Sequence, residues 1–339
     1  MQRLKRLFRT EVDPWMVAEI ALGTTLSILA ADAAGLKYGA VAGITTLLTI
    51  QTTREMTVRS ALNRYAAFLL MVALCGLTMP ALGFTTPVFG LFLLLFIGLC
   101  WLLGLQDVIA SNAVLATHFL LEGNMGMPLI VNAFWLLTIG AAVGLAVNLV
   151  MPYRRAPLAK YRDDIEDNFR HILRVMAQRT LCPDCEGVAE AALTVDFEDT
   201  EAKLAGYERA ALRERGNRLF GASDYPVAYF QMRSRQASFL RRMWANLVRT
   251  QRSHGPNSLL ANFFEETAGS FGERNNALRL LAQLDGIDSQ YDSLPLPRDR
   301  GEFEDRALLY AITQDLRGFL EIKRDFVAGR APGDMDRYW

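Results

Sequence analysis

The chain has 339 residues, 51% of them hydrophobic, and its 36 Lys and Arg residues balance its 36 Asp and Glu residues. Zero net charge argues against a nucleic-acid-binding protein, which needs a basic surface to displace counterions from phosphate. With four Cys and three His, the composition also excludes a disulfide-rich secreted globule and a chain rich in metal sites.

Charge is distributed unevenly along the chain. Residues 1–150 contain 8 basic and 7 acidic side chains, so 15 of 150 positions are charged, whereas residues 151–339 contain 28 and 29, so 57 of 189 are. A soluble domain carries about 25% charged residues. The sequence therefore predicts an all-α protein made of a membrane half followed by a water-soluble half.

The first half contains six segments that approach the roughly 20 apolar residues needed to cross a bilayer. They lie at about 15–35, 38–54, 65–83, 87–104, 106–122 and 128–150. The second and fifth are short and contain polar residues, so we expect neighbouring helices to shelter them from lipid. This predicts a basic cytoplasmic N-terminus at 1–14 and a six-helix transmembrane domain at 15–152.

Basic residues indicate the orientation of these spans. They cluster before the first span, between the second and third (Arg54, Arg59 and Arg64) and after the sixth, while Lys37 lies on the opposite side. Short loops rich in Lys and Arg stay cytoplasmic, which predicts that both termini and the domain at 153–339 are cytoplasmic. A cleaved signal peptide is the alternative for the N-terminus, but Glu19 within the apolar run argues against it.

Polar residues within the first and sixth spans are candidate pathway residues. Glu19, Asn132 and Asn148 lie among small residues at helical spacing. Glycines in such a pattern are explained by close helix packing, since they let two backbones approach. A carboxylate or amide in hydrocarbon is expensive, so these three residues either bond across helices or line a transport pathway.

The fifth span carries a narrower polar stripe. At about 100° per residue, four side chains fall within roughly 60° of one another, namely Asp107, Ser111, His118 and Glu122. His118 and Glu122 lie one turn apart, and an imidazole titrates near neutrality, so the pair is a candidate proton relay. In the alternative, Asp107 and Glu122 mark the two membrane surfaces and His118 is a hydrogen-bonded core residue.

The second half reads as four or five amphipathic helices, at about 157–182, 188–219, 225–253, 258–284 and 305–328. Cys182 and Cys185 form a CPxC pair, which we interpret as a turn between helices with reduced thiols, because a structural zinc site needs four ligands. No phosphate-binding loop, HExxH or GxSxG motif is present. The sequence thus predicts no enzyme, no cofactor and no metal site.

Several segments resemble the bacterial aromatic acid exporter family. In the membrane half, the similar segments are Thr45–Arg64, which contains Gln-Thr-Thr-Arg-Glu and Asn-Arg, and Val147–Pro152. In the soluble half, they are Leu294–Tyr310, Phe319–Phe326 and Tyr229–Gln236. Where the family has a Gly-Thr-x-x-Gly pattern entering the third span, this chain has the bulkier Tyr65–Met71. The resemblance implies a six-span inner-membrane protein, related to fusaric-acid-resistance exporters and distantly to plant aluminium-activated malate transporters, which moves small organic anions as a homo-oligomer.

The sequence therefore favours an exporter of aromatic or related carboxylic acids in the bacterial cytoplasmic membrane, with the lipid bilayer and a small organic anion as its partners. Arg54, Arg59 and Arg64 are expected to gather carboxylates at the cytoplasmic mouth, unless they serve only to set the topology. The alternative function is a membrane-anchored, dimeric assembly or signalling protein that acts through its helical tail.

Overall fold

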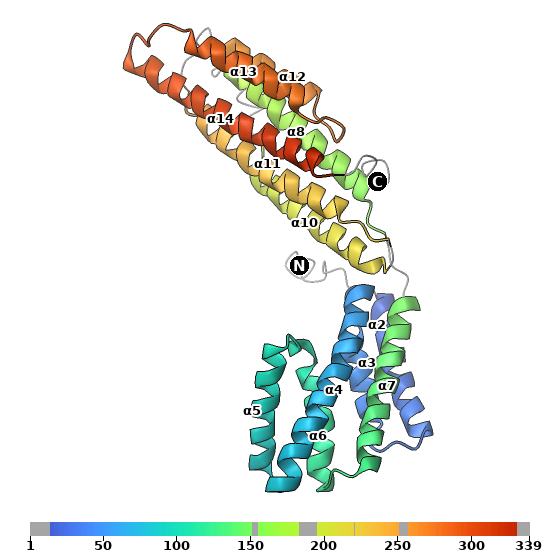
Figure 1. Cartoon of the computed structure of the whole chain (residues 1–339). Coiled ribbons are helices and arrows are strands. Elements are labelled where there is room, and N and C mark those ends of the chain that lie inside the picture. The colour runs from blue at the N-terminus through green and yellow to red at the C-terminus, as the bar shows by residue number, and fades with distance from the viewer. Residues whose placement is uncertain (1–13, 151–154, 183–194, 220, 251–256, 331–339) are drawn as a thin grey trace, which may run out of the picture. The chain divides into compact units, whose positions relative to one another are not determined.

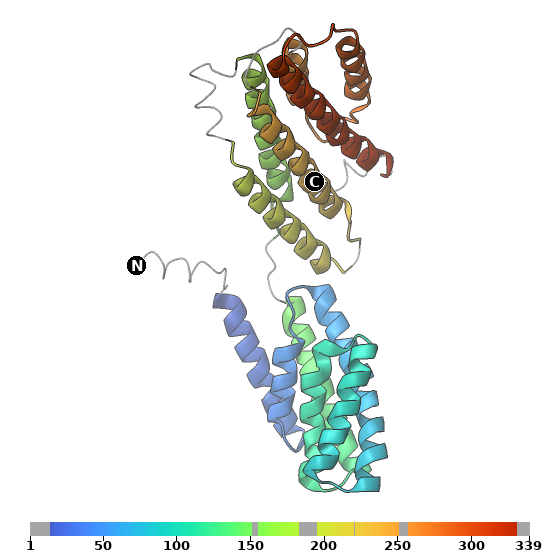
Figure 2. The same cartoon turned by 90° about the vertical axis from the view of Figure 1, so that its left-hand side faces the viewer.

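The computed structural model describes residues 14–150, 155–182, 195–219, 221–250 and 257–330. These residues form twelve α-helices and one 3₁₀-helix, and none of them lies in a β-strand (Figures 1 and 2). The predicted all-α fold is confirmed. The chain divides into two compact units, Met1–Arg154 with Gly216–Gly221, and Arg155–Arg215 with Ala222–Trp339.

The first unit is a helical bundle. Its helices are α2 (Pro14–Ala33), α3 (Ala40–Thr49), α4 (Arg54–Leu82), α5 (Thr86–Leu102), η1 (Gln106–Val108), α6 (Ile109–Glu122) and α7 (Met127–Val150). Helix α3 packs against α2 and α7, while α4 contacts α5, α6 and α7 (Figure 1). The core between them is apolar and rich in aromatic rings, including Phe68, Phe92, Phe96 and Phe119.

Helix α4 begins eleven residues before the predicted third span at 65, and the reason is local. Thr53 has an extended backbone, and its hydroxyl accepts a hydrogen bond from the amide of Met56 at 3.3 Å. A threonine in this position satisfies one of the unpaired amides at a helix start. The cap lets the helix include the basic segment that contains Arg54, Arg59 and Arg64.

The outer surface of this bundle is apolar. Among the described residues, α4 and α7 are long and apolar enough to cross a membrane, and 33% of the most apolar 18-residue window of each is buried. Leu62, Leu69 and Leu77 of α4 are each more than 60% exposed. A core helix of a soluble protein would bury such residues, so this surface favours a lipid environment. Helices α3 and α5 are apolar but shorter.

The second unit is a second helical bundle. It consists of α8 (Leu158–Leu181), α10 (Phe197–Asn217), α11 (Tyr225–Leu247), α12 (Asn257–Gly269), α13 (Leu278–Asp292) and α14 (Arg300–Ala328). Helix α11 packs against both α14 and α8, and α12 packs on α8 (Figures 1 and 2). The core is apolar, with Phe169, Tyr229, Phe230, Phe264 and Phe319 fully buried.

Two of the predicted helices in this unit differ from the structure. The helix expected at 258–284 is two helices, because the chain turns between Gly269 and Leu278, where Ala277 has a positive φ of 62°. Helix α14 begins at Arg300, earlier than expected, because the Asp299 carboxylate accepts from the amide of Glu302 at 2.8 Å. Such a cap adds a turn before the apolar pattern starts.

The expectation of a reduced thiol at Cys182 is wrong, since Cys182 is disulfide-bonded. Residues 183–185 of the predicted turn, Cys185 among them, lie outside the described residues, and so do residues 188–194 of the helix expected at 188–219. The CPxC spacing is compatible with both oxidation states, so the sequence alone did not distinguish them. Cys75 and Cys100, in the first unit, are free and buried.

Candidate functional site

Arg64 is the largest buried polar residue of the first unit, and it is only 1% exposed. It lies ten residues into α4, about 15 Å from the first residue of that helix. Its Nη1 donates to the hydroxyl of Ser111, and its Nη2 donates to the carbonyl oxygen of Leu48 at 2.6 Å. Its Nε has no hydrogen-bond partner. Among the described residues, no carboxylate pairs with Arg64.

Two short helices bring these partners to Arg64. Helix α3 ends at Thr49 and the chain continues in an extended conformation at Ile50, which leaves the carbonyl of Leu48 available at the helix terminus. Helix α6 begins at Ile109, so Ser111 lies in its first turn. A helix start carries partial positive charge. The guanidinium and this helix start therefore both favour an anion at the same place.

Asn112, next to Ser111 in α6, is one further buried polar side chain. We call Arg64, Ser111, Asn112 and the Leu48 carbonyl the Arg64 cluster. Asn112 is fully buried; its amide donates to the carbonyl of Val108 at 3.0 Å, and its Oδ1 has no partner. The hydroxyl of Ser111 also donates to Val108, at 3.0 Å. The predicted polar stripe includes Ser111 but not Asn112, although both residues carry a polar group into a predicted span, and that polar group was the available signal.

A second polar group lies where α6 ends. Glu122 accepts from the ammonium of Lys37 at 2.8 Å and from the hydroxyl of Tyr38 at 3.1 Å. His118 is 3% exposed, and its ring stacks on that of Tyr38 with centroids 4.2 Å apart. Asn132 donates to the Lys37 carbonyl and accepts from the Lys37 amide, at 3.0 and 2.9 Å. Glu122, the predicted partner of His118, thus forms hydrogen bonds with Lys37 and Tyr38, which lie between α2 and α3.

The predicted polar stripe of the fifth span is therefore divided. Ser111 lies in the Arg64 cluster, whereas His118 lies near the other end of α6. Asp107, eleven residues before His118, is exposed in η1. Only the two middle members, Ser111 and His118, are buried. The helical wheel predicted the common face correctly for them, but the residues with which each one bonds come from different helices.

The remaining predicted site residues lie elsewhere. Arg54 donates to the carbonyl of Leu149 at 3.0 Å, and Asn148 donates to the carbonyl of Gln51 at 3.0 Å, which joins the start of α4 to the end of α7. Arg59 is exposed. Glu19 is half-buried on α2 and, within the described residues, forms no hydrogen bond or ion pair with either polar group. Of the three arginines expected at one mouth, only Arg64 is buried.

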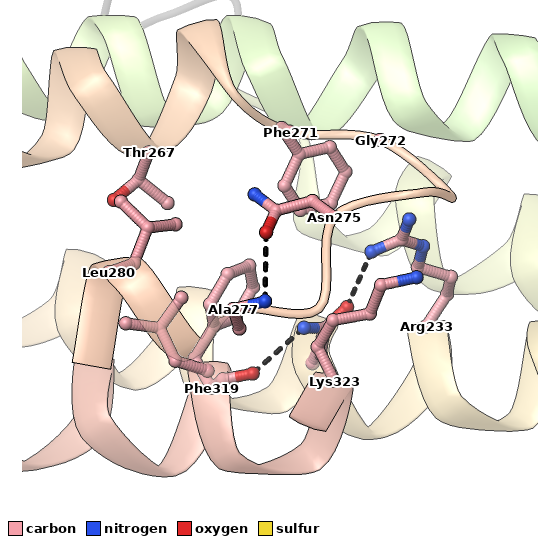
Figure 3. Close-up of a pocket in the computed structure, with 11 residues that line it drawn as sticks. Arg233, Thr267, Phe271, Gly272, Asn275, Ala277, Leu280, Phe319 and Lys323 are labelled. Carbon is pink, nitrogen blue, oxygen red and sulfur yellow. Dashed lines mark hydrogen bonds between the residues drawn. The ribbon is translucent and has the colours of Figure 1, made fainter. Parts of the chain in front are cut away.

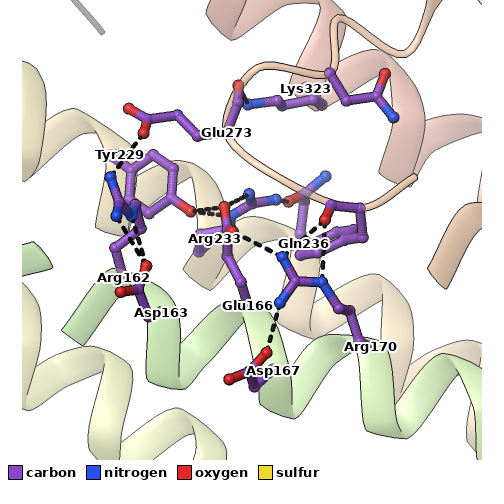
Figure 4. A network of polar contacts seen from close by, with 12 residues as sticks. Arg162, Asp163, Glu166, Asp167, Arg170, Tyr229, Arg233, Gln236, Glu273 and Lys323 are labelled. Atoms are coloured by element: carbon purple, nitrogen blue, oxygen red, sulfur yellow. Dashed lines mark hydrogen bonds and ion pairs between the residues drawn. The ribbon is translucent and has the colours of Figure 1, made fainter. Parts of the chain in front are cut away.

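The second unit contains a buried ionic network (Figure 4). Glu166 of α8 accepts from the hydroxyl of Tyr229 at 2.6 Å, from Arg233 at 2.9 Å and from Arg170 at 3.1 Å. Arg233 is fully buried and also donates to the side-chain oxygen of Gln236 at 2.8 Å. Because Tyr229 and Arg233 belong to α11, this network fixes α8 against α11. Burial raises the pKa of the Tyr229 hydroxyl, so it stays protonated and donates.

No group of three or more His, Cys, Asp or Glu side chains among the described residues is arranged to hold a metal ion. The distinctive chemistry of the first unit is therefore a buried guanidinium beside hydroxyl, amide and helix-terminal groups. A guanidinium is chemically suited to binding a carboxylate through charge-assisted hydrogen bonds.

Comparisons with known proteins cover both units. Residues 16–151 match the family described as "Aromatic acid exporter family member 1", and residues 156–324 match the one described as "Putative aromatic acid exporter C-terminal domain". The uncharacterized protein YqjA of Bacillus subtilis (strain 168) is 29% identical over 306 residues, which cover 90% of this chain and 94% of that protein. A crystal structure of a "putative membrane protein" from Clostridium difficile 630 shares 18% identity with a TM-score of 0.43, covering 50% of this chain and 99% of that one.

Proposed function

Since this chain belongs to the aromatic acid exporter family, we propose that it exports small organic anions, in particular aromatic carboxylic acids, across the bacterial cytoplasmic membrane. Family membership supports a transporter in place of an enzyme. The substrate class is aromatic carboxylic acids, and the residue proposed to bind them is Arg64.

The observation that carries this proposal is the buried guanidinium of Arg64. A buried charge costs several kcal/mol unless a partner compensates it, and within the described residues Arg64 has only a hydroxyl and a carbonyl as partners. Its Nε donor is unused. A substrate carboxylate would supply the missing negative charge and accept from this donor, with the first turn of α6 adding a favourable electrostatic contribution.

The proposed arrangement in the membrane has six spans, corresponding to α2, α3, α4, α5, η1 with α6, and α7. Residues 15–152 form the transmembrane domain and residues 153–339 a cytoplasmic domain, with both termini in the cytoplasm and a homo-oligomer as the working form. The apolar outer surface of α4 and α7 supports insertion in lipid. The short helices α3 and α6 are then sheltered by their longer neighbours, as interrupted helices at transport sites are.

We further propose that transport is coupled to protons through His118. It is buried, its Nδ1 has no hydrogen-bond partner, and the Tyr38 ring on which it stacks carries a hydroxyl bonded to Glu122. His118→Gln should lower flux and flatten its pH dependence near neutrality. Normal flux with an unchanged pH profile would remove His118 from the mechanism and leave the exporter proposal intact.

The test of the proposed function is efflux of radiolabelled benzoate from proteoliposomes that contain the purified protein. Arg64→Gln removes the charge that should hold the carboxylate, so we expect benzoate flux to fall about tenfold or more, the equivalent of one charged hydrogen bond. Arg64→Lys keeps the charge but loses the forked donors and should give an intermediate flux.

Arg59→Gln is the matched control, since it makes the same change in the same helix at an exposed position. It should transport benzoate as the wild type does. Benzamide, which has the ring without the charge, should not be transported. Wild-type benzoate flux equal to that of protein-free vesicles would refute the exporter, and normal flux in folded Arg64→Gln protein would refute the role of Arg64.

A further inference from the structure

Two cavities in the second unit differ greatly in size. One lies between α11, the connection from α12 to α13, and α14, with Arg233 and Lys323 in its lining (Figure 3). Its volume is about 10 Å³, which leaves room for at most about one water molecule. The other lies between the end of α13, the connection that follows it and α14 (Figure 1), and its volume is about 180 Å³. Of these two, only the second is large enough for a small organic ligand.

The walls of this second cavity, which we call the α13–α14 cavity, come from two segments of the chain. Three of its residues lie at or just after the end of α13 and three lie on α14, namely Tyr291, Asp292 and Leu294, and Arg306, Leu309 and Tyr310. The amide of Leu294 donates to the carbonyl of Tyr291 at 3.2 Å, and Nη1 of Arg306 donates to the carbonyl of Pro295 at 2.5 Å. These two hydrogen bonds turn the chain after α13 and fix the connection to α14.

Most of the lining is suited to an apolar group. Leu309 is 3% exposed and Tyr310 is 59% exposed, so the cavity extends from the core to the surface. An apolar cavity of about 150 Å³ binds benzene. A space of about 180 Å³ beside two leucines and two tyrosines therefore accommodates a phenyl group, and aromatic rings pack favourably on one another.

Two opposite charges border the same cavity without contacting each other. Asp292 is exposed and, within the part of the chain that the structure describes, forms no hydrogen bond or ion pair. Arg306 donates to the Pro295 carbonyl and forms an ion pair with Glu302. A guanidinium has five N–H groups, two on each terminal nitrogen, so each terminal nitrogen of Arg306 retains one. The cavity is thus bordered by an unpaired carboxylate and by a guanidinium with spare donors.

The end of α13 strengthens the negative side of the cavity. Asp292 is the last residue of that helix, and the carbonyl groups at a helix C-terminus carry partial negative charge. An ammonium group is therefore favoured beside Asp292. A ligand that is only an anion would be repelled by Asp292, and one that is only a cation would be repelled by Arg306. A ligand that carries both charges matches both sides.

We propose that the α13–α14 cavity binds a zwitterionic α-amino acid with an aromatic side chain. The carboxylate of the ligand accepts from the terminal nitrogens of Arg306, its ammonium donates to Asp292, and its ring packs against the leucines and tyrosines of the lining. Such a ligand bridges the end of α13 and α14. The inference does not depend on the exporter function, and it gives the second unit a ligand of its own.

The test is isothermal titration calorimetry on the full-length protein in detergent, with L-phenylalanine and two analogues that each lack one charge. 3-Phenylpropanoate keeps the ring and the carboxylate, whereas phenethylamine keeps the ring and the ammonium. L-Phenylalanine should bind about tenfold or more tightly than either, because each analogue loses one charge-assisted hydrogen bond. Glycine has both charges but no ring, and it should also bind about tenfold or more weakly.

Two results would overturn the proposal. One is the absence of binding by L-phenylalanine, and the other is an equal affinity for either analogue, which would identify a site for simple aromatic anions or cations. Benzoate efflux measured on the same preparation tests the exporter separately, so a failure of one proposal leaves the other intact.

Asp292→Asn removes the charge that should hold the ammonium, at an exposed position without a partner in the described chain. It should weaken binding of L-phenylalanine about tenfold, while 3-phenylpropanoate should bind no more weakly than to the wild type. Asp325→Asn is the matched control, since Asp325 is an exposed residue of α14 that does not line the cavity. It should bind L-phenylalanine as the wild type does.

Leu294→Trp tests the cavity itself, because the larger side chain fills the space and leaves both charges in place. It should abolish binding of L-phenylalanine. Wild-type affinity in folded Asp292→Asn or Leu294→Trp protein would show that the ligand binds elsewhere and would refute this site.

Discussion

Asn132 and Glu122 stabilise the connection between α2 and α3 in different ways. Tyr38 adopts a positive φ of 65°, a conformation that is unfavourable for a bulky residue unless its surroundings hold it. Asn132 forms two hydrogen bonds with the backbone of Lys37, next to Tyr38, while Glu122 contacts side-chain atoms. The backbone contacts fix the conformation of the chain, whereas the Lys37 ion pair is exposed.

We therefore expect Asn132→Ala to lower the free energy of unfolding of the first unit by about 1 kcal/mol or more, because both backbone hydrogen bonds are lost. Lys37→Gln should change it much less, because an exposed ion pair contributes little and the Lys37 side chain is 64% exposed. Thermal unfolding in detergent compares the two. A larger loss of unfolding free energy in Lys37→Gln than in Asn132→Ala would show that the ion pair between Lys37 and Glu122 stabilises this connection.

Burial of Lys323 predicts a pH dependence of the stability of the second unit. Its pKa is lowered to about 7 from its ordinary value of 10.5 by burial, so between these values the unfolded chain binds more protons than the folded chain. The contribution of this residue to stability should therefore rise as the pH increases from 7 towards 10 and stay at its minimum below 7.

Denaturant unfolding at several pH values, for the wild type and for Lys323→Met, isolates this contribution as the difference between two curves. Other groups titrate equally in both proteins and cancel. A difference that is constant between pH 7 and pH 10 would mean that Lys323 is charged in the folded state.

At the scale of elements, the packing of α3 against α7 depends on small residues. A Cβ atom at Gly140 would lie 2.5 Å from the carbonyl oxygen of Ala42 and 2.6 Å from Cβ of Thr45. The hydroxyl of Thr46 donates to the carbonyl of Gly140 at 3.0 Å. The glycine at position 140 in the sixth span is thus explained by close helix packing, as the sequence pattern predicts.

Gly140→Ala should destabilise the first unit by about 1–3 kcal/mol, because the two helix backbones must separate to admit the methyl group. Gly98→Ala is the control, since nothing lies within 4 Å of a Cβ at Gly98 in α5, and alanine favours a helix by up to about 1 kcal/mol. Unfolding midpoints in the same detergent test both. Equal midpoints for the two variants would contradict the role of Gly140.

The split between α12 and α13 shows where periodicity misleads. Asn275 and Asn276 accept hydrogen bonds from the amides of Ala277 and Leu278, at 2.8 and 3.2 Å. Asparagine side chains compete with helical hydrogen bonds in this way. The apolar pattern continues on both sides of the turn, so it predicted one helix, although the Asn-Asn pair was a signal for a break.

At the scale of the whole molecule, the proposed topology is the feature that connects the two units with function. A reporter fused after Trp339 should be active in the cytoplasm, and one inserted near Gly126 should be active in the periplasm. The reason is that loops rich in Lys and Arg stay on the cytoplasmic side of the membrane. Alkaline phosphatase and green fluorescent protein fusions measure this. A periplasmic tail would overturn the six-span arrangement.

The sequence by itself determined the helical fold and most helix boundaries, because apolar periodicity acts over a few residues. The starts of α4 and α14 were placed too late, since periodicity does not register the caps at Thr53 and Asp299. It also identified Arg64 and Ser111 as candidates, but gave no reason to prefer Arg64 to Arg59, since both are arginines in one basic segment.

Only the tertiary structure decided which of these residues are buried and which meet. Arg64 reaches Ser111 across 47 residues of sequence, and Lys37 reaches Glu122 across 85. Such contacts depend on where α3 and α6 end relative to α4, and those ends are set by packing between helices. A helical wheel contains no information on the neighbouring helix, so the buried charge of Arg64 emerged only when the helices were assembled.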